Sequence, residues 1–84
     1  MPDLLSFLDA VDRARPVEEL PPPAVCRRLR QEAGLPLHHV AVALGAEPST
    51  IATWERGLSR PRVQSANEWR KVIAVLQARV GTTQ

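Results

Sequence analysis

Hydroxyl and guanidinium side chains gather in the segment between positions 48 and 62. Ser49, Thr50 and Thr53 fall within one short stretch. The arginines that follow this stretch are Arg56, Arg60 and Arg62. Hydroxyl groups both donate and accept hydrogen bonds, and a guanidinium group presents a rigid fork of donors that matches a phosphate. Proteins contact the backbone and base edges of DNA with residues of these types, so the segment is a candidate nucleic-acid surface.

Two short helices that meet at a glycine are expected to position this surface. The apolar residues of the first helix recur at helical spacing: Leu37, Val40, Ala41 and Leu44. Gly45 follows them and can end the helix in the left-handed conformation. Pro48 is suited to the first turn of the second helix, which we expect to run to Arg56. Ile51 and Trp54 are expected to face inward.

This arrangement resembles the Xre or lambda-repressor-like helix-turn-helix family, which includes the phage Cro proteins. The resemblance covers Cys26 to Trp69. Ala41 stands where the family brings two helices close together, Gly45 where it turns, and Glu55-Arg56-Gly57 where its helix-ending motif falls. The resemblance implies an all-α fold, a lambda-repressor-like bundle of about five short helices that includes an added N-terminal helix.

The resemblance also implies which residues contact DNA when the second helix enters the major groove. The residues expected at base edges are Pro48, Ser49, Thr50, Ala52 and Thr53. A methyl group of Ala52 or of a threonine can contact a thymine methyl there. The residues expected on the DNA backbone are His38, Arg56, Arg60 and Arg62. Arg30 occupies the family's arginine position, which implies a partly buried ion pair with Glu55 that is kept for geometry more than for net stability.

Three positions depart from the family's pattern. Leu37 stands where relatives have a glutamine that binds a phosphate, so that contact is absent or comes from His38. Pro36 replaces a serine or threonine, which removes a side-chain cap from the first helix. Glu47 puts a carboxylate near phosphates, which repels them unless the carboxylate accepts a hydrogen bond from a cytosine amino group.

Charge divides the chain into an acidic head and a basic body. Residues 1–23 hold two arginines against five acidic residues, a balance of −3. Residues 24–84 hold nine basic residues against four acidic ones, a balance of +5. A basic body attracts phosphates whatever the base sequence, whereas an acidic head is expected to lie off the DNA.

The head is expected to form a helix from about Asp3 to Ala14. Its apolar stripe consists of Leu4, Leu5, Leu8 and Val11, with Phe7 close to the edge of the stripe. The stripe either folds back on the chain's own core or packs against a partner chain. Residues 20–23 form a stiff connector, because three successive prolines lack backbone donors. The next helix is expected to run to Ala33, with Gly34 closing it.

A last helix is expected from about Val63 or Ser65 to Val80. Its apolar residues are Trp69, Val72, Ile73, Leu76 and Val80. This face is expected to close the core around Trp54. A surplus apolar face there can also form a two-fold dimer contact, which places two recognition helices about 34 Å apart. The chain therefore divides into residues 1–23 (helix and connector), 24–80 (DNA-binding domain) and 81–84 (frayed tail).

Several classes of function find no support in the sequence. The single Cys26 cannot form an internal disulfide, and no signal peptide or apolar run near 18 residues is present, so we expect a cytoplasmic protein in a bacterial host cell. His38 and His39 are adjacent and face different sides of a helix, so no metal site is expected. We also expect no catalytic residues and no cofactor.

The sequence thus predicts a non-enzymatic, sequence-specific regulator of transcription that binds double-stranded DNA, Cro-like or repressor-like and carried by a phage or prophage. A homodimer is compatible with this function. An alternative is an antitoxin or adaptor that binds a partner protein through residues 1–23. A third reading is a recombination directionality factor, which would bend DNA strongly.

Overall fold

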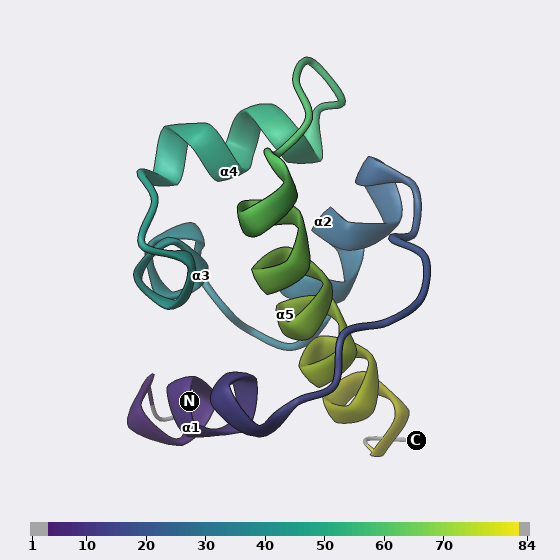
Figure 1. Ribbon diagram of the computed structural model, residues 1–84. Helices are drawn as coiled ribbons and strands as arrows, with labels where there is room; N and C mark the ends of the chain where they lie inside the picture. The colour runs from purple at the N-terminus through teal and green to yellow at the C-terminus, as the bar shows by residue number, and fades with distance from the viewer. Residues whose placement is uncertain (1–3, 83–84) are drawn as a thin grey trace.

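A computed structural model describes residues 4–82, and these residues form helices and no strand (Figure 1). The helices are α1 (Leu4–Arg13), α2 (Pro23–Glu32), α3 (Leu37–Leu44), α4 (Pro48–Glu55) and α5 (Val63–Thr82). The long helix α5 runs through the middle of the molecule and contacts α1, α2 and α3, while α3 and α4 contact one another. The all-α fold expected from the sequence is confirmed.

Most helix ends fall within one or two residues of their expected positions. Helix α1 ends at Arg13 and not at Ala14, and Asp3 lies outside the described residues. Helix α4 ends at Glu55, with Arg56 in the cap that follows. Helix α5 continues beyond Val80 to Thr82, so this part of the expected frayed tail is helical. Residues 83–84 lie outside the described part of the chain.

Glycines in the left-handed conformation end α2, α3 and α4. At the turn between α3 and α4, Gly45 has a φ of 63°. Its N–H donates to the carbonyl of Val42 at 3.2 Å, and the N–H of Ala46 donates to the carbonyl of Ala41 at 3.0 Å. This pair of bonds is the Schellman motif, which satisfies the last carbonyls of a helix and requires a residue that tolerates positive φ. Gly45 therefore fixes the angle at which α4 leaves α3.

Replacing Gly45 with alanine is expected to lower the free energy of unfolding by about 1 to 2 kcal/mol, since a Cβ disfavours the left-handed conformation. The cost is conformational, because an added Cβ meets no atom within 4 Å. Gly81→Ala is the matched control: Gly81 lies within α5, also in open space, and gains helix propensity on substitution. Thermal unfolding should show a lower midpoint for Gly45→Ala only. Equal midpoints for both variants would contradict this role of the turn.

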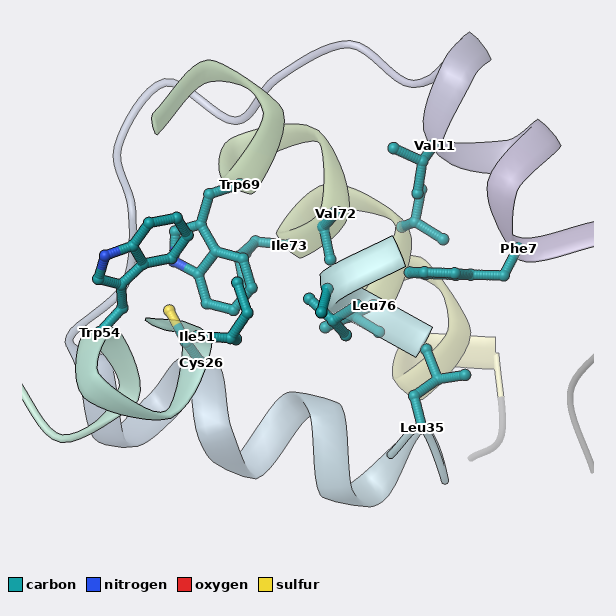
Figure 2. Close-up of a cluster of buried hydrophobic side chains, with 13 residues drawn as sticks. Phe7, Val11, Cys26, Leu35, Ile51, Trp54, Trp69, Val72, Ile73 and Leu76 are labelled. Atoms are coloured by element: carbon teal, nitrogen blue, oxygen red, sulfur yellow. The ribbon is translucent and has the colours of Figure 1, made fainter. Parts of the chain in front are cut away.

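The core is organised along α5. Val72, Ile73 and Leu76 are fully buried, with Trp54 and Trp69 at one end of the cluster and Phe7, Val11 and Leu35 at the other (Figure 2). The indole rings of the two tryptophans meet edge to face, with centroids 5.9 Å apart. Along this face of α5, Trp69, Val72, Ile73 and Leu76 are buried within their own chain, whereas Val80 is half-buried. These buried residues are not open to a two-fold contact.

Helix α1 packs on the core of the same chain. Phe7 is fully buried and Val11 is buried, whereas Leu5 is 74% exposed. Phe7, expected close to the edge of the stripe, is thus more deeply buried than Leu5, expected within it. The Arg79 guanidinium lies 5.5 Å from the centroid of the Phe7 ring. Figure 1 shows α1 at the end of the molecule opposite α4, so the acidic residues of α1 stand apart from the expected DNA-binding helix.

Candidate nucleic-acid interface

Helix α4 is anchored on one face and open on the other. Ile51, Trp54 and Glu55 are buried. The residues expected at base edges lie on the remaining face: Pro48 and Ser49 are exposed, and Thr50, Ala52 and Thr53 are half-buried. Ile51 and Trp54 are three residues apart, and Glu55 follows Ile51 at a spacing of four, so all three fall on one side of the helix. The small polar residues between them are consequently left at the surface.

The Thr53 hydroxyl is engaged within α4. Its Oγ1 donates to the backbone carbonyl of Ser49 at 2.8 Å. A hydroxyl has one hydrogen, so Thr53 cannot donate to a base while this bond persists. Its methyl group and the oxygen lone pairs remain. The bond therefore favours a role in which the Thr53 methyl group makes an apolar contact with a thymine methyl.

An ion pair between Arg30 and Glu55 joins α2 to α4. The Arg30 Nε donates to Glu55 Oε2 at 2.8 Å, and Nη2 donates to Oε1 at 3.1 Å. The third donor, Nη1, bonds the backbone carbonyl of Leu35 at 2.9 Å. Both side chains are buried. Because one guanidinium holds α4 and the turn before α3 together, the pair sets the position of α4 relative to the rest of the domain.

The expected backbone-contacting residues are exposed. Arg56 caps α4, and Arg60 and Arg62 lie in the loop that leads to α5. His38 is exposed in the first turn of α3. Three basic residues therefore follow the carboxyl end of α4, while His38 belongs to the neighbouring helix.

Helices α3 and α4 begin after residues that depart from the family's pattern, and neither start has a side-chain capping hydrogen bond. Neither Pro36, before α3, nor Glu47, before α4, makes a side-chain capping hydrogen bond. Glu47 is exposed, and its backbone carbonyl accepts from the N–H groups of Thr50 and Ile51. Its carboxylate is thus not engaged in capping.

Arg27 joins the basic residues near α4, which the sequence reading missed. It lines a shallow hollow of about 90 Å³ together with Leu37, Ala52 and Arg56. Arg27 precedes Arg30 by three residues in α2, which is one helical turn on the same face. This spacing could have placed Arg27 near α4 from the sequence alone, because Arg30 was expected to contact Glu55 of α4.

The structure also bears on metal binding and on membrane crossing. Within residues 4–82, no group of three or more His, Cys, Asp or Glu side chains is arranged to hold a metal ion. None of the helices described combines the length and apolar character needed to cross a membrane. The His38 and His39 rings meet edge to face with centroids 4.5 Å apart.

Comparison with known proteins agrees with this geometry. Residues 25–83 match the model of a family described as helix-turn-helix domain, and this match spans α3, α4, α5 and most of α2. No curated protein and no solved structure was found to match the chain. Helix-turn-helix proteins place their second motif helix in the major groove of DNA. The matched residues include the turn at Gly45, both helices beside it and the buried pair, so the chain belongs to the helix-turn-helix domain family of DNA-binding proteins.

Proposed function

We propose that this protein is a sequence-specific transcriptional regulator of the Xre or lambda-repressor-like type, Cro-like or repressor-like and carried by a phage or prophage. Helix α4 enters the major groove. Its side chains at base edges are Pro48, Ser49, Thr50, Ala52 and Thr53. The groups on the DNA backbone are His38, Arg56, Arg60 and Arg62, with Arg27 added from the hollow beside Arg56.

One observation carries the proposal: α4 keeps small hydroxyl and methyl groups at the surface while Ile51, Trp54 and Glu55 hold it from behind. A helix of this kind brings its backbone close to base edges because no long side chain intervenes. Small side chains then read the groove by short hydrogen bonds and methyl contacts. The arginines at the end of α4 supply the attraction to phosphates, which fixes register without reading sequence.

The charge distribution supports the same orientation. Asp9 and Asp12 of the acidic head lie in α1, which Figure 1 shows opposite α4. Docking through α4 keeps the negative charge of Asp9 and Asp12 at the far end of the molecule, where the screening of physiological salt over about 8 Å weakens repulsion. The net charge of +5 on residues 24–84 then acts on the DNA with little opposition.

Selection from a random duplex library is the direct test. The full chain is expected to enrich one duplex sequence over random DNA by at least about 10³-fold, as specific binders of this kind do. Failure to enrich any sequence, with the chain folded, would contradict the proposal.

Paired substitutions at Thr53 test how α4 reads the groove. Thr53→Val keeps the methyl group and loses the hydroxyl, whereas Thr53→Ser keeps the hydroxyl and loses the methyl. Because the hydroxyl already bonds Ser49, the valine variant should retain the preferred sequence and the serine variant should lose about tenfold in preference at one thymine. Competition binding with single-base variants of the selected site measures both. The reverse result would assign the contact to the hydroxyl.

Arg62→Ala should act differently from the Thr53 variants. It is expected to weaken binding to specific and random duplexes alike and to reduce the slope of log affinity against log salt by about one. Arg15→Ala, in the acidic head, removes the same charge from an exposed site and is the matched control. If the two variants reduce affinity equally, Arg62 contributes only general charge.

The adaptor and recombination readings make different predictions. An adaptor surface on α1 has to use its outer residues, such as the exposed Leu5, since Phe7 and Val11 are occupied in the core. Leu5→Ser should then abolish retention of a partner protein and leave DNA binding intact. A recombination directionality factor would bend its site strongly, which gel mobility of circularly permuted fragments detects.

A further inference from the structure

We propose that a second site of this protein binds a small organic anion that combines an apolar, preferably aromatic, body with one carboxylate. The site is a cavity of about 540 Å³ between the proline connector, the loop around Arg60 and the first half of α5. Its volume lies within the usual range for small-molecule sites. This ligand site goes beyond the DNA-binding role, because it is built on the inward side of Trp54 and not on the outward face of α4.

The apolar half of the cavity is built from indole rings and prolines. Trp54 and Trp69 both line it, and their edge-to-face contact, seen in Figure 2, gives a wall of aromatic carbon. Residues 21–23 also line the cavity, where the proline rings restrict the backbone and leave no N–H donors to be satisfied. Such a wall is already ordered before a ligand arrives, which lowers the entropic cost of binding.

Cys26 adds to this apolar half. Burial raises the pKa of its thiol to about 11, with the nearby Glu55 charge acting in the same direction. The thiol therefore stays neutral at physiological pH. Its Sγ donates to the carbonyl of Pro21 at 3.5 Å, so it takes part in the wall as a small apolar group.

The polar half of the cavity is cationic. Arg60 and Arg70 both line it, and within the part of the chain that the structure describes neither forms an ion pair with a carboxylate. The Arg70 Nη1 donates to Asn67 Oδ1 at 3.3 Å, but its Nε is buried and has no hydrogen-bond partner among those residues. This Nε is closed to solvent, so the other guanidinium nitrogens of Arg70 and those of Arg60 are the donors available to a ligand.

A carboxylate in the cavity pairs with the guanidinium groups of Arg60 and Arg70 that line it, and the indole rings cover the body that carries it. Carboxylates match the planar fork of arginine and form charge-assisted bonds with it. A DNA phosphate supplies the charge but no apolar group to cover the tryptophans. The two halves together therefore select an apolar carboxylate over a phosphate or a neutral hydrocarbon.

The test uses 1-naphthoate and the full chain without DNA, so that its result does not depend on the proposed regulator function. Both tryptophans of the chain line the cavity, so their two indole N–H signals in a ¹H–¹⁵N correlation spectrum report on it. We expect saturable shifts of both signals with a Kd of about 1 mM or tighter, as suits a ligand of this size. The uncharged 1-naphthamide should bind at least about tenfold more weakly, and acetate should give no saturable shift.

Substitutions locate the site. Arg70→Met should weaken 1-naphthoate binding at least about tenfold, while Arg28→Met, an exposed arginine of α2 outside the cavity, should leave it unchanged. Ala66→Leu, which fills the cavity, should abolish binding. If Arg70→Met does not fold, Arg60→Met applies the same test. Absence of saturable shifts, equal binding of the amide, or an equal effect of Arg28→Met overturns the proposal.

Discussion

Replacing Arg30 with methionine is expected to lower the free energy of unfolding by about 3 to 5 kcal/mol, because it leaves the buried Glu55 carboxylate without its partner. The substitution also frees the Leu35 carbonyl, which loses its bond to Arg30 Nη1. Urea unfolding followed by tryptophan fluorescence measures the change, since Trp54 neighbours Glu55 in α4. A small domain has a total stability of about 5 to 15 kcal/mol, so this single change removes a large part of it.

The double variant Arg30→Met/Glu55→Met separates loss of a charge partner from loss of packing. Two apolar side chains of similar length fill the same space without an unpaired charge, so the double variant should be more stable than Arg30→Met alone. It should not fully recover, because the Leu35 carbonyl still lacks its donor. A loss of less than about 1 kcal/mol in the free energy of unfolding for Arg30→Met would contradict the assigned role, because exposed ion pairs contribute this little.

The Arg30–Glu55 ion pair could not be predicted from residue spacing, whereas the helices beside it could. Residues 37–44 and 48–55 were predictable as helices because local signals mark their ends: a left-handed glycine after Leu44 and a proline at the start of α4. Arg30 and Glu55 are separated by 25 positions, and no periodic pattern connects them. Their pairing came from the resemblance alone.

Other features of the structure also depend on three-dimensional contacts that no local sequence pattern records. Leu35 is buried although it lies in a turn, where no helical period identifies an inward residue. The Thr53 hydroxyl bond is local but depends on a rotamer that composition does not determine. The cavity beside Trp54 requires a connector, a loop and a helix to converge, so it is visible only in three dimensions.

Phe7 shows how tertiary packing decides between two faces that the helical pattern leaves nearly equal. The leucines of α1 and Phe7 lie on adjacent sides of the same turn, so the hydrophobic stripe can be drawn through either. Contact with α5 selects Phe7, which is fully buried, and leaves Leu5 exposed. Helix α1 is therefore part of the domain's core. Deleting residues 1–23 would consequently disturb the fold as well as any partner surface.

Phe7→Ala is expected to lower the free energy of unfolding by about 3 to 5 kcal/mol, since it removes a fully buried ring and leaves a cavity between α1, α5 and Leu35. Leu5→Ala, on the exposed side of the same helix, should change stability by less than about 0.5 kcal/mol. Urea unfolding at several protein concentrations distinguishes an intramolecular role from an interface. If α1 packs on its own chain, the loss in Phe7→Ala is independent of concentration; a loss that grows as concentration rises would show that the ring contacts a partner instead.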